Sequence, residues 1–334
     1  MSDAVREEAG VTKPFEFNGE GFEYFKIWIV NILLTILTLG IYSAWAKVRN
    51  KRYFYSNLCL EGHNFEYLAD PITILKGRII AVIVLVIYIG VSQFYPLAGA
   101  GLGIILMIAL PWLTVRSLMF NNRMSAYRNV QFRFHGSAGE AAKVLFLWPL
   151  VGILTLGIMY PYALLKINKF IVENSAYGTT SFEFDATFKD YGLIFLFMIG
   201  IFLVGAGVFI GASMLLEPLG AFVMVLVYIV AIAYTAVAFA NLYYNSTTLA
   251  AHGFEADLQV GAYAKVVLIN LVLIVLTLGL YLPAAKVRLV KYYADNISFL
   301  PVGSLDDITA AERVNVAALG EELGEVFDFD IGVT

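Results

Sequence analysis

Six stretches of this chain contain no Asp, Glu, Lys or Arg, and they restrict its fold more than any other feature. They cover residues 27–46, 79–115, 144–165, 191–216, 218–254 and 266–285. Each is about as long as, or longer than, the roughly 20 apolar residues that a helix needs to cross a bilayer. The pattern excludes a soluble enzyme, and the single cysteine, Cys59, excludes a secreted disulfide scaffold. We therefore expect an all-α integral membrane protein that forms a multi-pass helical bundle.

The charges divide the chain of 334 residues into two acidic ends and a basic middle. Residues 1–26 carry a net charge of −3, residues 27–297 carry +6 and residues 298–334 carry −7. The first part lacks the basic start and the early apolar run of a signal peptide. We expect an acidic N-terminal segment that is not a leader, a basic membrane body and an acidic C-terminal tail.

A Thr-Leu-Gly motif occurs three times and marks an internal repeat. Each copy remains in register with the others for 20 residues. Glycine is the residue that a tight reversal of the chain prefers, so the predicted turn residues are Gly40, Gly157 and Gly279. On this basis the chain divides into membrane repeats at 27–129 and 130–250 and a truncated membrane repeat at 251–297.

A shorter motif, Phe-x-aromatic, recurs between the apolar stretches. Aromatic residues that alternate behind a turn containing Gly or Asn predict short strands, so we expect short cytoplasmic β-hairpins. In the acidic tail, Ser304 and Asp307 are spaced like a capping box and predict a helix over about 305–318. We expect the strand after this helix to pair with an earlier one, such as the strand at Phe15. The copies of the motif are Phe15-Phe17, Phe65-Tyr67, Phe132-Phe134, Phe182-Phe184, Phe327-Phe329 and the weakened Phe254-Ala256.

Taken together, these motifs resemble the YjgN family of bacterial inner-membrane proteins. The resemblance extends from about Phe15 to the C-terminus, although the middle repeat departs from the family pattern with Met159 in place of a tyrosine. It implies an inner-membrane location, and it implies no activity, because the family is a domain of unknown function. The matching segments are Thr-Leu-Gly-Ile-Tyr at 38–42, Ala-Lys-Val-Arg at 46–49, Tyr-Phe-Tyr-Ser-Asn at 53–57, Glu-Gly-His-Asn-Phe-Glu-Tyr at 61–67 and Val-Phe-Asp-Phe-Asp-Ile-Gly at 326–332.

Two topologies fit the apolar stretches. If every stretch crosses the membrane, seven spans leave 15 basic residues on one face and 7 on the other. If the Thr-Leu-Gly segments enter and return on one side, four long spans remain and all 22 basic residues share one face. Residues 27–39 form only about 20 Å of helix, which is too short for a hydrocarbon core of about 30 Å. Since Lys and Arg collect on the cytoplasmic side, we favour the re-entrant arrangement with both termini cytoplasmic.

The sequence offers no constellation for catalysis. It contains no phosphate-binding loop, no nucleophile elbow and no His-Glu-x-x-His zinc motif. His63 and His252 each lie two residues before the Phe of a predicted hairpin, which favours a role in turns over metal ligation. Polar residues in the apolar stretches, such as Asn31 and Asn270, are expected to hydrogen-bond between helices. We expect no enzyme activity, no cofactor, no metal site and no nucleic-acid partner.

Basic residues follow each Thr-Leu-Gly motif and are the candidate contacts for lipid headgroups. One interpretation is that these residues orient the chain in the membrane. The alternative interpretation is that they form a ring of sites for anionic headgroups. We favour a non-enzymatic membrane scaffold or lipid-contacting protein, and a transporter or channel for a neutral or amphipathic solute remains the alternative. The expected partners are membrane lipids, with a second copy of the chain or another membrane protein as further options. The candidate residues are Lys47, Arg49, Arg52, Lys166, Lys169, Lys286, Arg288 and Lys291.

Overall fold

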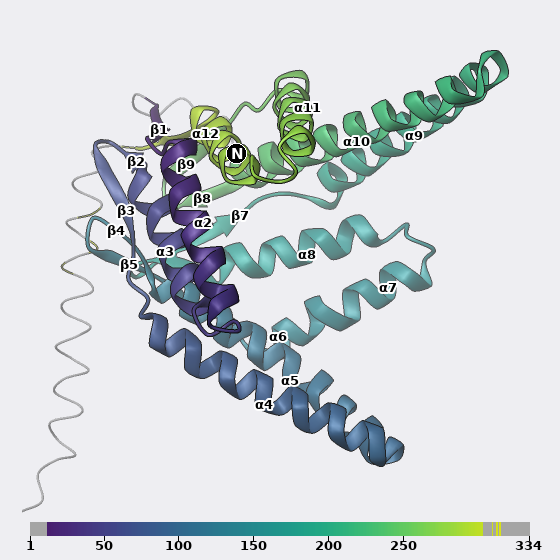
Figure 1. Cartoon of the computed structure of the whole chain (residues 1–334). Coiled ribbons are helices and arrows are strands. Elements are labelled where there is room, and N and C mark those ends of the chain that lie inside the picture. Colours follow the sequence, from purple (N-terminus) through teal and green to yellow (C-terminus); the bar gives the residue numbers. More distant parts are fainter. Residues whose placement is uncertain (1–11, 303–308, 310–311, 313, 315–334) are drawn as a thin grey trace, which may run out of the picture.

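The computed structural model describes residues 12–302 together with residues 309, 312 and 314. Ten short strands in this part of the chain form one closed antiparallel barrel at one end of the molecule (Figure 1). The prediction of an all-α fold is therefore wrong. The predicted hairpins do form, but they pair with one another. A lone hairpin is marginally stable and leaves both edges unpaired, whereas a closed barrel has no edge.

The strands follow one another around the barrel in chain order, and β1 pairs with β10 to close the ring. Phe15 of β1 lies opposite Leu60 of β2, and Lys13 lies opposite Phe299 of β10. The strand that closes the barrel is thus the one directly after the last helix, and the tail strand predicted at 327–329 lies outside the described residues. The strands are β1(Lys13–Phe17), β2(Leu58–Leu60), β3(His63–Tyr67), β4(Ser125–Tyr127), β5(Val130–Phe134), β6(Ser175–Tyr177), β7(Thr180–Phe184), β8(Thr247–Leu249), β9(His252–Ala256) and β10(Ile297–Leu300).

From β1 to β10 the chain is a series of five strand–helix–turn–helix–strand units. Each odd-numbered strand leads into a helical hairpin, and the next even-numbered strand leads out of it. Helices of neighbouring units pack against each other, and α12 of the last unit packs against α2 of the first. The helices are α2(Gly21–Leu37), α3(Ser43–Asn57), α4(Pro71–Phe94), α5(Pro96–Arg123), α6(Ala138–Ala142), the π-helix η1(Lys143–Leu147), α7(Trp148–Leu154), α8(Tyr160–Glu173), α9(Phe188–Leu215), α10(Glu217–Asn245), α11(Val260–Leu276) and α12(Leu282–Asp295).

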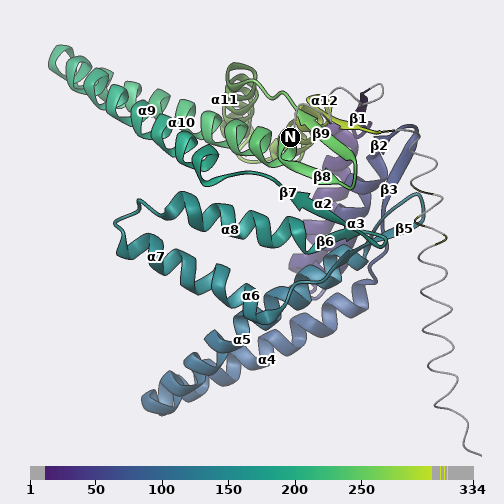
Figure 2. The ribbon, with the colours of Figure 1, turned by 180° about the vertical axis from the view of Figure 1, so that it is seen from behind.

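All helical hairpins leave the barrel at the same end. Neighbouring strands run in opposite directions, so the helix pairs, which join odd strands to even strands, lie at one end. The β-turns, which join even strands to odd strands, lie at the other end. Figures 1 and 2 show α4/α5, α7/α8 and α9/α10 projecting away from the strands and diverging from one another. The barrel therefore has a helix end and a turn end.

The Phe-x-aromatic motif sets which face of each strand points inward. Side chains two residues apart in a strand share a face, and the second motif position still pairs with the next strand, at the helix end of the barrel. The first Phe of each motif packs into the barrel interior, as Phe65 and Phe132 do. The second aromatic packs against the helices, as Tyr67 and Phe134 do. One motif thus joins the barrel core to the helical layer.

Four helices are long and apolar enough to cross a membrane, namely α4, α5, α9 and α10, with 24, 28, 28 and 29 residues. Only 6–17% of their most apolar windows is buried inside the protein, so most of this apolar surface faces outward. The Thr-Leu-Gly segments instead form shorter helices that turn back. Both α2 and α11, for example, have 17 residues and end at a reversal of the chain.

Candidate functional site

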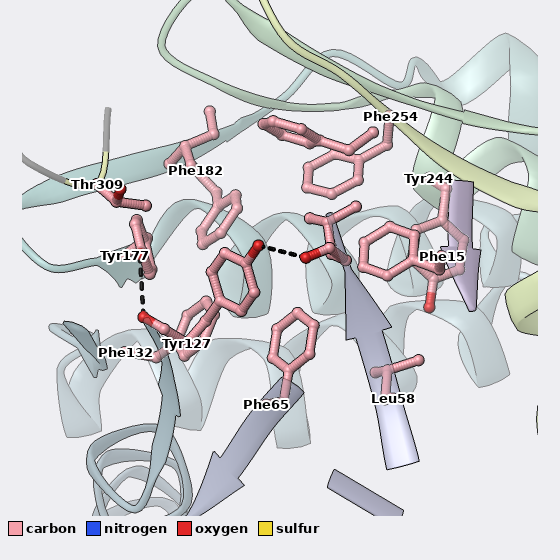
Figure 3. Close-up of a pocket in the computed structure, with 13 residues that line it drawn as sticks. Phe15, Leu58, Phe65, Tyr127, Phe132, Tyr177, Phe182, Tyr244, Phe254 and Thr309 are labelled. Carbon is pink, nitrogen blue, oxygen red and sulfur yellow. Dashed lines mark hydrogen bonds between the residues drawn. The ribbon is translucent and has the colours of Figure 1, made fainter. Parts of the chain in front are cut away.

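The barrel encloses a cavity of about 260 Å³ that is lined almost entirely by apolar side chains. One phenylalanine from each odd-numbered strand borders it, and their rings surround the open space (Figure 3). These five residues are Phe15, Phe65, Phe132, Phe182 and Phe254. Leu58, Leu60, Tyr127, Tyr177, Tyr244, Leu249, Phe299 and Thr309 complete the lining. We call this cavity the lumen.

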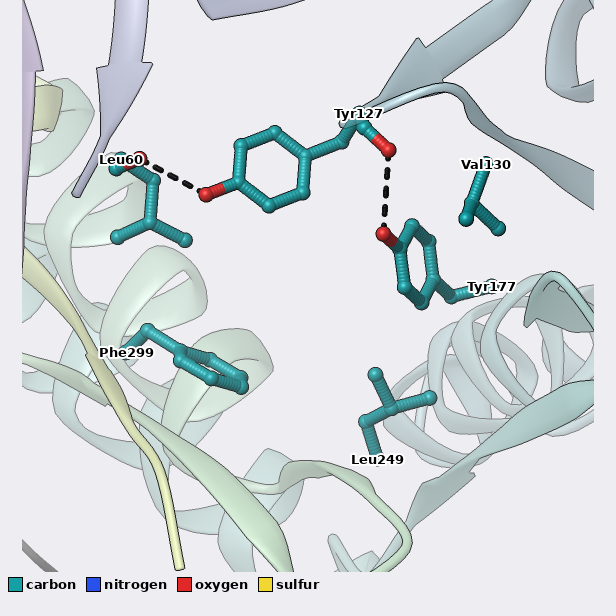
Figure 4. Packing of buried hydrophobic residues seen from close by; sticks show 6 residues of the cluster. All are labelled: Leu60, Tyr127, Val130, Tyr177, Leu249 and Phe299. Atoms are coloured by element: carbon teal, nitrogen blue, oxygen red, sulfur yellow. Dashed lines mark hydrogen bonds between the residues drawn. The ribbon is translucent and has the colours of Figure 1, made fainter. Parts of the chain in front are cut away.

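Two tyrosine hydroxyls of the lumen wall are used in hydrogen bonds to the backbone (Figure 4). The hydroxyl of Tyr127 donates to the carbonyl of Leu60 at 2.8 Å, and that of Tyr177 donates to the carbonyl of Tyr127 at 3.1 Å. Burial raises the pKa of the Tyr127 phenol to about 12, although the neighbouring Arg128 guanidinium partly opposes the shift. Tyr127 and Tyr177 therefore present ring surface, rather than hydroxyl hydrogens, to the lumen.

Two described residues of the C-terminal segment, Thr309 and Glu312, lie at the turn end of the lumen. Thr309 lies in its wall, and the buried carboxylate of Glu312 accepts hydrogen bonds at the β6–β7 turn. One Glu312 oxygen lies 2.7 Å from the backbone nitrogen of Thr179 and 2.9 Å from the hydroxyl of that residue. The other accepts from the Thr180 hydroxyl. Residues 309, 312 and 314 are helical, within the helix predicted over about 305–318, whose other residues lie outside the described part of the chain.

Charged and polar groups surround the same turn end. Glu61 lies 2.8 Å from the ammonium of Lys13 and 3.4 Å from the guanidinium of Arg128, so it links β1 to the β4–β5 turn. The backbone N–H of Val302 donates to Nδ1 of His252 at 2.9 Å. Burial lowers the pKa of this imidazole, which agrees with its acceptor role. The turn end is polar, whereas the lumen behind it is apolar.

At the helix end, a second cavity of about 200 Å³ adjoins the lumen. The two cavities share Phe15, Leu58 and Tyr244 in their walls. The rest of the second cavity is formed by α12 and the strand after it, with Val290, Tyr293, Ala294 and Ile297. We call this second cavity the vestibule.

A separate groove of about 320 Å³ lies between η1 and α8, and it collects three lysines. Lys166 and Lys169 of α8 border it together with Lys143 of η1. The ammonium of Lys166 lies 6.0 Å from the centre of the Trp148 ring, which also borders the groove. Glu140, Glu173, Val144, Phe170 and Asn174 line the remainder, and Lys169 pairs with Glu173 at 3.1 Å. We call this the lysine groove.

The π-helix beside the groove has a cause in the sequence. Pro149 has no backbone N–H and cannot donate to the carbonyl of Leu145, so the helix cannot keep its regular bonding there. The preceding turn is wider, with the N–H of Trp148 bonding to the carbonyl of Lys143 five residues back. Single π-turns of this kind often occur at functional sites. Lys143 and Trp148, the two residues joined by that hydrogen bond, both border the groove.

The other predicted basic residues do not join this site. Arg52 donates to the carbonyls of Tyr67 and Ala69 and so holds α3 against the start of α4. Arg288 donates to Asn270 at 3.2 Å within its own helical hairpin. The ammonium of Lys286 lies 4.5 Å from the ring centre of Phe54, which brings α12 to α3. Lys47, Arg49 and Lys291 are exposed on their helices.

The three predicted turn glycines occupy equivalent reversals. Gly40, Gly157 and Gly279 have φ values of +92°, +91° and +91°. Each follows a leucine that also has positive φ. This is a backbone conformation that side chains other than hydrogen disfavour.

The remaining polar candidates have structural partners. Asn31 donates to Asn50 at 2.9 Å, and Asn270 donates to the carbonyl of Ala285 at 3.2 Å, so both join the two helices of a hairpin as predicted. His63 Nδ1 lies 2.9 Å from the carbonyl of Glu61 in the β2–β3 turn. Within the described residues, no group of three or more His, Cys, Asp or Glu side chains is arranged to hold a metal ion.

Four long apolar helices mounted on a β-barrel define a membrane protein. Residues 12–326 match the family described as bacterial protein of unknown function (DUF898), and the chain belongs to that family. It is similar to the inner membrane protein YjgN of Escherichia coli O157:H7 and of Escherichia coli K12, each 30% identical over 161 residues. The YjgN protein of Salmonella typhimurium LT2 is 29% identical over 160 residues.

These matches cover 48% of this chain and 40% of each relative, so the chain matches less than half the length of its curated relatives. No solved structure matches the chain. The comparisons confirm the resemblance to the YjgN family that the motifs indicate, and the relatives are inner membrane proteins by name.

Proposed function

We propose that this protein is a non-enzymatic inner-membrane scaffold that binds an anionic phospholipid headgroup in the lysine groove. The single observation that supports this most is the convergence of Lys143, Lys166 and Lys169 in one groove. Basic pockets between membrane helices are suited to phosphate-bearing headgroups. An adjacent tryptophan, here Trp148, is the residue type that prefers the headgroup level.

Charge balance in the groove favours an anion. Lys169 is paired with Glu173, and Glu140 is occupied by the capping box that it forms with Ser137. The ammonium groups of Lys143 and Lys166 have no carboxylate partner among the ion pairs of the described residues, and each is placed at the start or end of an apolar segment. A phosphate between these two groups would accept charge-assisted hydrogen bonds from both.

The fold supports insertion of all helical hairpins from one face, with the barrel and both termini cytoplasmic. The strands that separate the apolar stretches all pair in a single ring. One ring cannot lie on both faces of a bilayer. From Lys143 to the end of α7 is about 18 Å of helix, while α9 is about 42 Å long. The Thr-Leu-Gly hairpins would therefore enter the bilayer part of the way, and α9/α10 would cross it.

Transport of a solute finds less support in this geometry. Transporters bind their solutes between packed helices near the middle of the membrane. Here α4/α5 and α9/α10 diverge from each other as they leave the barrel (Figures 1 and 2). The groove between α9 and α10 is lined by residues of those two helices alone.

Native mass spectrometry of co-purified lipid tests the headgroup site. The double variant Lys143→Gln, Lys166→Gln should retain less phosphatidylglycerol or cardiolipin than the wild type, with phosphatidylethanolamine unchanged. The matched control is Lys76→Gln, Lys265→Gln, which removes the same charge from exposed residues that also open apolar segments, on α4 and α11. Equal loss of anionic lipid in both variants would show that only overall charge matters, and the groove site would be rejected.

A further inference from the structure

We infer that the lumen holds the end of a lipid hydrocarbon chain that enters through the vestibule. This inference is independent of the lysine groove, which lies outside the barrel between η1 and α8. It concerns a second site, formed by all ten strands and occupied by a different part of a lipid.

The chemistry of the lining defines the class of ligand. Six phenylalanine rings, three leucines and three tyrosines form nearly all of the wall, and two of the tyrosines, Tyr127 and Tyr177, donate their hydroxyls to backbone carbonyls. A polar solute entering this space would lose its hydrogen bonds to water without replacing them. A hydrocarbon chain loses none, and it gains contact with the rings.

The size of the space also favours an occupant. Protein interiors are close-packed, and voids much larger than a water molecule are few. Apolar cavities of about 150 Å³ remain free of water and bind small hydrocarbons such as benzene. The lumen has about 260 Å³ and adjoins a further 200 Å³ in the vestibule.

The ends of the space define the direction of entry. At the turn end, Thr309 lies in the lumen wall and Glu312 is anchored to the β6–β7 turn (Figure 3 shows Thr309 on one side of the cavity and Tyr244 and Leu58 on the other). At the helix end, Tyr244 is at the base of α10, and Tyr293 is at the base of α12. The vestibule lies at the bases of the helices, where the acyl chains of membrane lipids are the nearest hydrocarbon.

Photo-crosslinking in nanodiscs of phosphatidylethanolamine and phosphatidylglycerol tests the inference on the full chain. One arm uses phosphatidylglycerol with a diazirine at the end of one acyl chain, and the other uses a free fatty acid with the same group. We expect covalent labels on lumen residues such as Phe132 and Phe182, identified by tandem mass spectrometry. Labelling by the first probe indicates a phospholipid tail, and labelling by the second alone indicates a free fatty acid. Labels confined to the outward faces of the helices with both probes would overturn the inference.

A variant that fills the lumen provides the second readout. Leu249 is buried in the lumen wall opposite Phe182, so Leu249→Trp should abolish labelling of the lumen residues and leave the labelling of the helices unchanged. The control Leu203→Trp adds the same bulk on the outward face of α9 and should leave lumen labelling intact. Unchanged lumen labelling in folded Leu249→Trp would overturn the inference. If that variant does not fold, the labelling pattern of the wild type still decides.

Discussion

The hydroxyl of Thr38 accepts a hydrogen bond from the backbone N–H of Tyr42 at 2.9 Å and donates one to the carbonyl of Leu34 at 2.7 Å. The same two bonds are formed by Thr155 and by Thr277. Backbone groups that reverse direction inside a bilayer must be satisfied without water. The leucines at the three turns are 94–95% exposed, so neighbouring helices do not cover them. In each turn, the threonine hydroxyl therefore supplies a hydrogen-bond acceptor for one backbone N–H.

Loss of this hydroxyl should destabilise the turn. Thr277→Val keeps the shape of the side chain but removes both hydrogen bonds, and we expect a loss of about 1 kcal/mol in the free energy of unfolding, as for other helix caps. Thr277→Ser, which keeps the hydroxyl, should remain close to the wild type. Unfolding in detergent measures both variants, and equal stability of the two would contradict the capping role.

Substitution of the turn glycines should act through the backbone alone. Gly157 has a φ of +91° and open space where a Cβ would be, so Gly157→Ala should cost about 1–2 kcal/mol of stability through conformational strain. Gly139 of α6 also has open space but a helical backbone. The control Gly139→Ala should be neutral, or stabilising by about 0.5–1 kcal/mol. If both substitutions have the same effect in thermal unfolding, the strain argument fails.

Tyr127, a buried tyrosine of the lumen wall, can be tested both by its absorbance and by its effect on stability. Tyr127→Phe removes the hydrogen bond to the Leu60 carbonyl and should reduce stability by about 1 kcal/mol. Because burial raises the pKa of Tyr127 to about 12, the variant should lose phenolate absorbance only above about pH 11 relative to the wild type. The exposed Tyr95 provides the control substitution, and Tyr95→Phe should leave the stability unchanged. Loss of a phenol that ionises near pH 10 in Tyr127→Phe would contradict its burial.

His252 should make stability depend on pH at the turn end. Burial lowers its pKa in the folded protein below the ordinary value of 6.5. In the unfolded chain the imidazole takes up a proton as the pH falls through 6.5, while the folded protein keeps it neutral. The free energy of unfolding should therefore fall below about pH 6.5 and be independent of this group above it. His252→Asn, which retains an acceptor for the Val302 N–H, should lose that part of the pH dependence, and an unchanged profile would rule out this role.

Local patterns predicted the elements of this fold but not how they assemble. The Thr-Leu-Gly motif predicts a reversal because glycine and a hydroxyl are local devices, and each Phe-x-aromatic strand can be read from alternation alone. The barrel requires Phe65 to lie beside Tyr127, about 60 residues away, and Lys13 opposite Phe299. Such pairings depend on the return of long helical hairpins, which no local pattern encodes. A strand recurs on each side of every helical hairpin. This regular recurrence was the sequence signal that could have indicated a closed ring of strands.

Only part of the candidate site was predicted, because the site also depends on how the helices assemble. Lys166 and Lys169 were identified from their repeat position, but the third lysine of the groove, Lys143, lies on the preceding helix. Lys143 could be found only by pairing the two helices of the hairpin. Pro149, which widens the turn beside it, was a local signal that points to the same place.

Cysteine accessibility in intact cells tests most directly the claim that every helical hairpin enters the membrane from the face that carries the barrel. In a background with Cys59→Ala, single cysteines replace exposed residues of the barrel at His63, Gln131 and Ser181, and exposed residues of the helix tips at Tyr95 and Glu217. We expect an impermeant thiol reagent to label the two tips in intact cells and to label the three barrel positions only after permeabilisation. Labelling of Ser181→Cys but not of His63→Cys in intact cells, as an alternating seven-span topology requires, would contradict it.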